Sequence, residues 1–343
     1  MKITCTAENL RAAVLATERF TGRHVTLPIL AHLLCRADEK KITFVATNLE
    51  VGIEYRITGK IHKPGQVTIP AKHFSQIIPS LRDETVTLEV KHHQLAIHTP
   101  STDITLNGLN PVDFPNLPSI KKEHSSAIPA NLIAATLQRV LPAAATSDLK
   151  PELAGVLFSF TPKTMILAAT DSFRLAEKTN TDVGGITDRA ECIIPFRTAQ
   201  EIARMLDAAG ETEVRVATGE HQVVFEWDET RILSRLIDGV YPPYQTIIPQ
   251  RYETTILVSR EDLLTTIRLA AVFSSRLNDV TLRFSPTELE VSTANSEIGS
   301  TNVRLAAKGR GASGTAVFNY RYLADGLEAA GGENVLLNLN GVS

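Results

Sequence analysis

The feature that most constrains the fold of this sequence is a pattern that recurs three times along its 343 residues. A Thr followed by a short polar corner occurs at Thr47, Thr170 and Thr293, at equal intervals of 123 residues (47 to 170, 170 to 293). The middle copy, Ala168-Ala169-Thr170-Asp171-Ser172-Phe173-Arg174-Leu175, predicts a strand, a tight corner and a second strand. A fixed period predicts repeated copies of one plan, and the chain is also too long for one typical core.

Two kinds of helix recur with nearly the same period. A strand that runs through Pro or Asn into an amphipathic segment occurs around Pro70, Pro195 and Asn319. Pro and Asn both suit a helix start. Another helix opens each repeat, because apolar residues there follow the i, i+3, i+4, i+7 spacing of one buried face. We expect these opening helices over about residues 7–20, 129–141 and 259–273.

Short strands with turn signals fill the rest of each repeat. In the first repeat we expect strands over about 29–37, 41–47, 50–59, 66–70, 85–90, 94–99 and 102–107. Proline-rich seams follow residues 110 and 241, and clustered prolines suit domain connectors because they cannot continue a ladder. The order helix, strands, helix, strands predicts an α+β fold with antiparallel sheets. We expect three domains of one plan, at 1–118, 119–249 and 250–343.

The third copy is shorter than the second. After its second helix, repeat two has predicted strands over about 213–217, 221–226 and 230–235. Repeat three has one, over 334–339, before the sequence reaches Ser343. The sequence therefore predicts a third domain that lacks its C-terminal strands or is built differently.

Composition narrows the class of protein. The chain is 43% hydrophobic, which supports buried cores and argues against disorder. Its three cysteines, Cys5, Cys35 and Cys192, form no C-x-x-C pair, so we expect free thiols in a reducing compartment. We find no apolar signal core at the N-terminus and no apolar run of membrane-spanning length, and we expect a cytoplasmic protein.

Charge is unevenly divided along the chain. The net charge is −3, which argues against a surface that is basic everywhere. The six predicted helical segments (7–20, 71–82, 129–141, 196–209, 259–276 and 319–329) together carry +3, so the remainder carries −6. This bias fits an ordinary solvated helix face. It also fits a weakly basic concave surface that attracts phosphates, with the acidic residues placed elsewhere on the protein.

No pattern in the sequence favours catalysis. The segment 309–314 matches G-x-G-x-x-G, but a dinucleotide site needs a helix next and residues 315–318 predict a strand. His92 and His93 lie at a predicted hairpin tip, with His98 near by, and no Cys or carboxylate completes a metal-ligand set. We expect a protein that is not an enzyme and that holds no metal or cofactor.

Five further segments occur in a fixed order along nearly the whole chain. They are Thr26-Leu27-Pro28-Ile29-Leu30, Asp113-Phe114-Pro115-Asn116-Leu117, Ala169-Thr170-Asp171 with Arg174-Leu175, Asp238-Gly239 with Tyr241-Pro242, and Phe318-Asn319 with Tyr322-Leu323. With the threefold repeat, they make this sequence resemble the bacterial DNA polymerase III beta subunit family, the sliding clamps. The resemblance implies the processivity-clamp fold, in which two chains close head-to-tail into a ring whose helices line the hole. Duplex DNA then passes through without base readout.

The resemblance also implies a function. A ring that slides needs only loose phosphate attraction, because topology retains it on DNA. The expected protein is a homodimeric clamp that gives the replicative polymerase processivity and binds polymerase, clamp loader and repair proteins through short peptides. The alternative is a truncated or clamp-like paralogue that acts as a peptide-binding module with poor ring closure.

Two sets of site residues follow from the resemblance. The positions near DNA correspond to Arg23, His24, Lys72, His73, Ser147, Lys150 and Arg197. His24 replaces a family arginine, and Pro151-Glu152 replaces an aromatic pair. The positions for ring closure correspond to Ile104, Leu106, Val272 and Phe273. Phe273 also fits ordinary core packing.

The family's partner-peptide pocket corresponds to a third set of residues. These are Leu153, Thr170, Ser172, Phe173, Arg174, Leu175, Pro242, Thr246, Ile247 and Val342. Apolar walls with a few polar groups suit a peptide with anchor residues. The family's C-terminal wall strand is absent and Ser172-Phe173 replaces the usual Gly-His, so we expect an open or altered pocket. The segment 170–175 also fits a plain hairpin corner, like 47–51.

Overall fold

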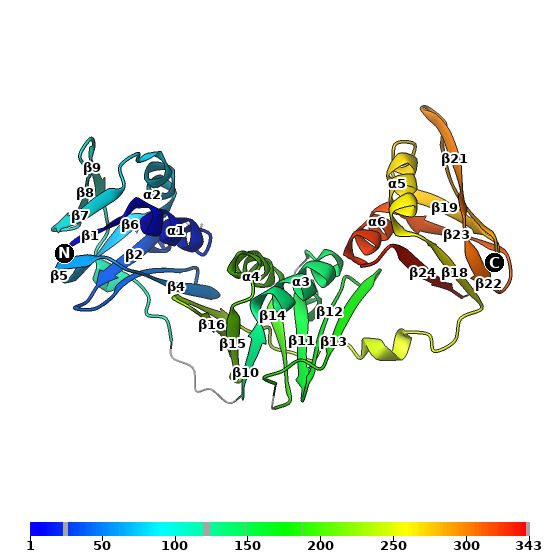
Figure 1. Ribbon diagram of the computed structural model, residues 1–343, viewed down its shortest axis with the longest axis horizontal. Coiled ribbons are helices and arrows are strands. Elements are labelled where there is room, and N and C mark those ends of the chain that lie inside the picture. Colours follow the sequence, from blue (N-terminus) through cyan, green and yellow to red (C-terminus); the bar gives the residue numbers. More distant parts are fainter. Residues whose placement is uncertain (23–26, 119–123, 148, 187, 341–343) are drawn as a thin grey trace. The chain divides into compact units, whose positions relative to one another are not determined.

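The structure, a computed structural model, describes residues 1–22, 27–118, 124–147, 149–186 and 188–340. Helices and antiparallel strands alternate along the chain in three successive repeats of an α+β plan (Figure 1). Contacts divide the chain into two compact units. Unit 1 comprises Met1–Ala135, Leu157–Ile166 and Thr179–Asp238, and unit 2 comprises Thr136–Val156, Leu167–Lys178 and Gly239–Ser343.

The first repeat forms one sheet of its own and part of a second. Its elements are β1 (Lys2–Thr6), α1 (Ala7–Glu18), η1 (Pro28–Ala31), β2 (His32–Ala37), β3 (Ile42–Thr47), β4 (Val51–Ile57), β5 (Lys60–Lys63), β6 (Gly65–Pro70), α2 (Ala71–Ile77), η2 (Ile78–Ser80), β7 (Thr85–Lys91), β8 (Gln94–His98), β9 (Asp103–Asn107) and η3 (Pro111–Asp113). The first sheet has the order β5-β1-β7-β8-β9, which leaves β9 at an edge.

The second repeat shares a sheet with the first. Its elements are β10 (His124–Pro129), α3 (Ala130–Val140), η4 (Leu141–Ala143), η5 (Pro151–Leu153), β11 (Gly155–Thr161), β12 (Thr164–Thr170), β13 (Leu175–Thr181), β14 (Ala190–Pro195), α4 (Phe196–Ala209), β15 (Glu213–Thr218), β16 (Gln222–Trp227) and β17 (Thr230–Arg235). The shared sheet runs β10-β15-β16-β17-β4-β3-β2-β6, and β13-β12-β11-β14 forms another. The two repeats are therefore joined by the pairing of β17 with β4.

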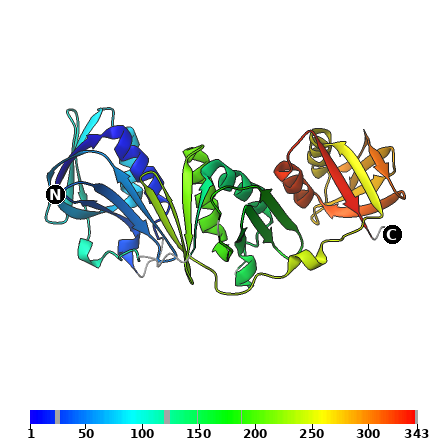
Figure 2. The same ribbon diagram turned by 60° about the horizontal axis from the view of Figure 1, so that its bottom comes forward.

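The third repeat has two separate sheets. Its elements are η6 (Tyr244–Ile247), β18 (Thr254–Ser259), α5 (Arg260–Ala271), β19 (Asp279–Phe284), β20 (Glu288–Asn295), β21 (Gly299–Ala306), β22 (Lys308–Arg310), β23 (Gly314–Asn319), α6 (Tyr320–Ala329) and β24 (Asn334–Leu339). The sheet orders are β22-β18-β24 and β21-β20-β19-β23. Figure 2 shows β18 and β24 side by side, and they pair from Ser259 opposite Asn334 to Thr254 opposite Leu339.

The helices form where the apolar spacing predicts them. Leu10, Val14 and Thr17, the predicted stripe of the first helix, are all buried, and Thr17 Oγ1 donates to the backbone oxygen of Ala13 at 2.7 Å. Two of the later helices have side-chain caps at their starts. Ser259 Oγ accepts from the Asp262 backbone N–H at 3.3 Å, and Asn319 Oδ1 accepts from that of Arg321 at 2.9 Å. The predicted buried face of the first helix is therefore confirmed.

Three local predictions differ from the structure. The helix expected over 71–82 ends its α-helical part at Ile77, because Pro79 has no N–H to continue the ladder. The strand β5 was not predicted. The prediction of a corner at Thr293 is wrong. Thr293 lies inside β20 opposite Thr301, and the hairpin turns only after Asn295, which pairs with Gly299.

Candidate functional site

The corner between β12 and β13 is held by a compact set of hydrogen bonds. Thr170 Oγ1 donates to the backbone oxygen of Arg174 at 2.7 Å and accepts from the Ser172 N–H at 3.2 Å. Asp171 Oδ1 accepts from the N–H groups of Phe173 and Arg174, at 2.9 and 3.0 Å. Ser172 has a φ of 76°, in the left-handed region. These bonds hold the side chain of Phe173 outward, where it is 83% exposed.

Arg174 connects this corner to the third repeat within unit 2. Its Nε lies 3.1 Å from Asp171 Oδ2, and its Nη1 donates to a carboxylate oxygen of Asp325 on α6. The guanidinium carbon also lies 4.4 Å from the ring centroid of Tyr322, one turn earlier on α6. Two carboxylates and an aromatic face together hold the guanidinium in one orientation.

The linker after β17 packs against the same region. Burial raises the pKa of Tyr241 to about 12, opposed in part by the nearby backbone of Thr170. The hydroxyl of the buried Tyr244 donates to Glu177 Oε2 on β13 at 2.6 Å, and burial followed by this bond raises its pKa. The two tyrosine rings meet edge to face at 6.2 Å. The linker is thus fixed to β13 and to the corner.

The predicted peptide-site residues fall into an exposed group and a buried group. Phe173 and Ile247 are 83% and 72% exposed, and Ser172 and Thr246 are also exposed. Leu153 is buried, while Thr170, Arg174, Leu175 and Pro242 are partly buried. Val342 lies outside the described residues. The bond of Tyr244 to Glu177 ties the linker to β13, the strand that follows the corner. The assignment of these residues to a peptide site stays a prediction.

Sequence reasoning missed four residues that build this surface. Tyr322 and Asp325 hold Arg174, Tyr244 holds the linker, and Val240, four residues before Tyr244, is an 86% exposed apolar residue. Tyr322 and Tyr244 both stand in segments already noted for their motifs. Tyr244 could have been found because it is an aromatic residue within a proline-rich seam. No pattern in the sequence pointed to Asp325.

The predicted DNA-facing residues are exposed where the structure describes them. Lys72 and His73 lie in the first turn of α2, Arg197 lies in the first turn of α4, and Ser147 and Lys150 lie in the segment before η5. Arg23 and His24 lie outside the described residues. Some of the basic charge on the helices is neutralised, because Arg19 on the α1 C-cap and Arg204 on α4 both pair with Glu201, at 3.4 and 2.9 Å.

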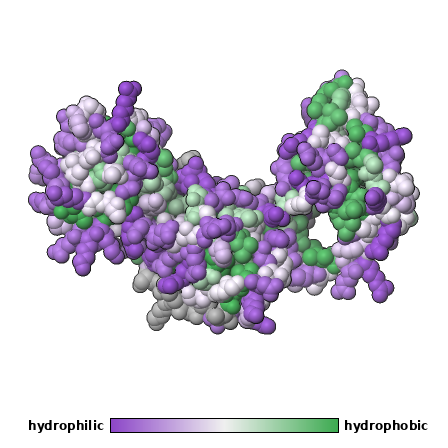
Figure 3. Space-filling model, in the orientation of Figure 1, coloured by the Kyte–Doolittle hydropathy of each residue, from purple (hydrophilic) through white to green (hydrophobic). Residues whose placement is uncertain are grey.

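The predicted ring-closure residues lie at two sheet edges. Ile104 and Leu106 are partly buried on β9, an edge strand of its sheet. Val272, the C-cap of α5, is 62% exposed, and Phe273 lies against Gly299 at the start of the edge strand β21. Figure 3 shows apolar surface gathered at this end of the third repeat. Leu277, in the loop after α5, and Ile298, in the turn before β21, are apolar residues that are 80% and 60% exposed and were not predicted.

Groups suited to catalysis or metal binding do not converge in the part of the chain that the structure describes. Cys5, Cys35 and Cys192 are free thiols, as predicted, and all three are buried; burial raises the pKa of Cys5 and Cys192 to about 12. His92 and His93 are exposed in the turn between β7 and β8. Among the described residues, no group of three or more His, Cys, Asp or Glu side chains could hold a metal ion. The described helices are too short or too polar to cross a membrane.

Comparison with protein families matches nearly all of the chain. The N-terminal, central and C-terminal domains of the DNA polymerase III beta subunit match residues 1–118, 127–243 and 245–343. The beta sliding clamp of Bacillus subtilis is 29% identical over 99% of this chain and 93% of its own length. That of a Synechocystis species is 28% identical over the same shares.

Solved structures agree with these matches. The Bacillus subtilis sliding clamp superposes with a TM-score of 0.95 at 27% identity and covers 100% of this chain and 93% of its own. A Pseudomonas aeruginosa sliding clamp bound to griselimycin superposes with a TM-score of 0.94 at 25% identity, with the same coverage.

Proposed function

The chain belongs to the DNA polymerase III beta subunit family, the sliding clamps, and we propose that it acts by encircling duplex DNA and tethering the replicative polymerase to it. The observation that carries this proposal is the match of three successive clamp domains along the chain. Its role is that of a processivity clamp. We propose an accessory subunit rather than an enzyme, because no site described above combines a nucleophile, a base and a pocket.

Ring closure is proposed to use the strand pairing already present inside the chain. In unit 1, β4 of the first repeat pairs with β17 of the second. By position in the repeat, β21 is the third-repeat counterpart of β4, and β9 is the first-repeat counterpart of β17. Both lie at sheet edges among the described strands. We propose that β21 pairs with β9 of a second copy, with Ile104, Leu106, Val272 and Phe273 in the interface.

DNA contact is proposed to be loose and to involve phosphates. Lys72 and Arg197 are exposed at helix starts, and no ion pair engages either side chain within the described residues. With His73, Ser147, Lys150, Arg23 and His24, they would attract the backbone without reading bases. Weak contacts suit a ring that must move along DNA while its closed topology prevents loss.

Partner binding is proposed at the second junction, the surface formed by the corner 170–175 and the linker 240–247. Phe173, on the corner, and Val240 and Ile247, on the linker, are exposed apolar side chains, and we propose that they receive the apolar anchors of a short peptide. We also propose that the three domains span residues 1–118, 119–249 and 250–343, with β24 following α6 in the described part of the third.

Topology gives the decisive test. The protein is loaded onto nicked circular plasmid, and the plasmid is then linearised beside an uncut control. A clamp stays with the circle and leaves the linear DNA through its free ends. Retention on linear DNA would contradict encirclement, and a monomer in sedimentation at micromolar concentration would contradict the homodimeric ring.

A further inference from the structure

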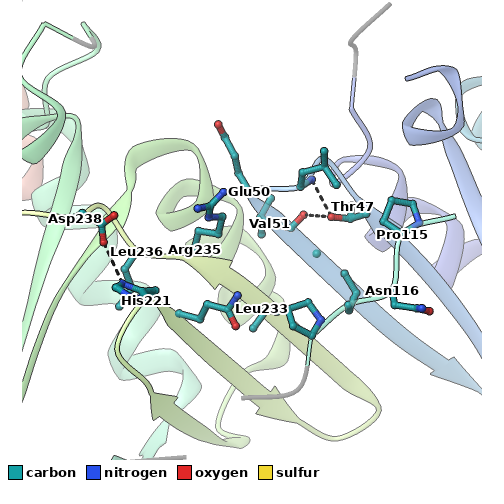
Figure 4. Close-up of a pocket in the computed structure, with 15 residues that line it drawn as sticks. Thr47, Glu50, Val51, Pro115, Asn116, His221, Leu233, Arg235, Leu236 and Asp238 are labelled. Atoms are coloured by element: carbon teal, nitrogen blue, oxygen red, sulfur yellow. Dashed lines mark hydrogen bonds and ion pairs between the residues drawn. The ribbon is translucent and has the colours of Figure 1, made fainter. Parts of the chain in front are cut away.

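The first junction, where β4 of the first repeat meets β17 of the second, contains a pocket of its own. It lies entirely within unit 1 and has a volume of about 510 Å³. Three segments line it: the corner 47–52, the linker 115–118, and the ends of β16 and β17 (Figure 4). This volume falls in the range of about 300–1,000 Å³ that is usual for ligand sites.

A rigid corner forms one wall of this pocket. Thr47 Oγ1 donates to the Val51 oxygen at 2.9 Å and accepts from the Leu49 N–H at 3.0 Å. Asn48 Oδ1 accepts from the N–H groups of Glu50 and Val51, at 2.9 and 2.8 Å. Leu49 is held with a φ of 78°, which is uncommon for a bulky residue, and its side chain is 49% exposed. The corner therefore presents an aliphatic side chain at a fixed position.

A second wall shows that this surface accepts an extended aliphatic segment. The chain's own linker, Pro115-Asn116-Leu117-Pro118, lies along it. Leu117 packs over Gly52 so closely that a Cβ at Gly52 would lie 2.4 Å from Leu117 Cδ2. The Pro118 oxygen accepts from Arg231 Nη2 at 3.3 Å. One aliphatic side chain and one carbonyl of an extended segment are thus already bound at one end of the pocket.

The third wall supplies an unpaired cation. The Arg235 N–H donates to the Glu50 oxygen at 2.8 Å, which ties the end of β17 to the corner. The guanidinium of Arg235 is exposed, and no hydrogen bond or ion pair engages it among the described residues. The other basic side chain of the lining, His221, lies 3.3 Å from Asp238 Oδ1. Arg235 is therefore the group available to a carboxylate, while Glu50 and Asp238 disfavour anions at either side.

We propose that the first-junction pocket binds a short extended peptide of a partner protein, in which an aliphatic residue lies next to a carboxylate. The aliphatic side chain contacts Leu49 and Leu236, and the carboxylate pairs with Arg235. The peptide continues the path on which the linker already lies. This site is separate from the surface proposed at the second junction, which belongs to unit 2.

A panel of capped, fluorescent hexapeptides tests the proposal on the full chain. Each peptide carries one Leu and one Asp, adjacent or separated by one or two residues on an Ala/Pro background, and each has a matched Asn peptide. We expect at least one Asp peptide to bind with a Kd below about 1 mM by fluorescence polarisation. Its Asn partner should bind roughly fivefold or more weakly, because the charge-assisted pair is lost.

Two variants place the binding at this pocket. Arg235→Glu should weaken the best peptide about tenfold or more, by replacing attraction with repulsion. Leu49→Gly should weaken it roughly threefold while keeping the fold, because Gly adopts positive φ readily. Arg215→Glu, an exposed arginine on β15 of the same sheet, and Phe173→Ala, at the second junction, should leave binding unchanged.

Each other outcome overturns the proposal. These outcomes are no binding by any Asp peptide, equal binding by the Asp and Asn peptides, and binding that is insensitive to Arg235→Glu. Loss of binding in Phe173→Ala would assign the peptide to the second junction instead.

Discussion

The two junctions of this chain have the same corner and different means of holding it. Around Thr47 and around Thr170, a threonine hydroxyl and an Asn or Asp side chain make equivalent bonds to the backbone. In the first junction β17 then pairs with β4 from Thr230 opposite Tyr55 to Ser234 opposite Val51. In the second, β13 lies at the edge of its described sheet, and side chains hold the corner.

Equivalent positions show how the two junctions diverge. Glu54 on β4 lies 3.5 Å from Arg231 of the paired strand. Its counterpart 123 residues on, Glu177, accepts from the hydroxyl of Tyr244 in the linker. The repeat therefore fixes the backbone of the corner, while the neighbouring strand is covered by a paired strand at β4 and is held by a linker side chain at β13.

The largest predicted difference between the junctions is in how much apolar burial on β4 and on β13 contributes to the free energy of unfolding. Ile53 on β4 is completely buried, while its counterpart Ala176 on β13 is partly exposed. We expect Ile53→Ala to lower the free energy of unfolding by about 2–5 kcal/mol, from lost transfer energy and a new cavity. Urea unfolding, with hydrogen exchange of the β17 amides, measures it.

Ala176→Gly is the matched control, and its cost should stay below about 1 kcal/mol. An equal effect of the two substitutions would show that β13 is as deeply packed as β4.

We expect the local stability of the second junction to depend instead on the guanidinium group of Arg174. Arg174→Ala removes the pairs with Asp171 and Asp325 and the contact with Tyr322. We expect a local cost of about 1–3 kcal/mol, seen as faster hydrogen exchange in α6 while β17 is unchanged. Arg174→Lys should recover only part of the protection, since lysine cannot make the forked contact. Unchanged exchange in α6 would mean that the backbone alone holds this junction.

The two linkers should also differ in how their stability responds to alkaline pH. Tyr241 occupies the aromatic–Pro position that Phe114 holds in the first linker. Because burial raises the pKa of Tyr241 to about 12, the folded state binds a proton that the unfolded state loses above pH 10. The stabilisation that protonated Tyr241 contributes is complete below pH 10 and is lost as the pH rises toward 12. The loss amounts to about 1.4 kcal/mol at pH 11. Hydrogen exchange in 240–247 between pH 9 and 11 measures the loss after correction for intrinsic rates.

The control for this prediction is Tyr241→Phe, which copies the first linker. It should remove part of the pH dependence at 240–247, leaving what Tyr244 contributes. An unaltered profile would assign the titration to other groups, such as the buried thiols.

Much of the fold was predictable because its signals are local and repeated. The apolar spacing and the Pro or Asn at helix starts gave the six helices, and the strand at 334–339 was placed correctly. The strand β5, Lys-Ile-His-Lys, was missed because its pattern is mostly polar. The corner residues of the candidate site were predictable from sequence for the same reason as the helices. The contact of Arg174 with Asp325 was not, since 151 positions separate the two and no local pattern links them.

The smallest predicted difference comes from one substitution made at both corners. Thr47 is almost fully buried and Thr170 is partly exposed, and each hydroxyl donates to one backbone oxygen and accepts from one N–H. Thr→Val keeps the shape and removes both bonds. At position 47 the orphaned groups stay buried, so we expect a cost of about 1–2 kcal/mol, and at 170 water can replace the hydroxyl, so about half that. Urea unfolding of the two variants gives the difference directly, and a larger cost at 170 would show that the side-chain-held corner is the more tightly sealed of the two.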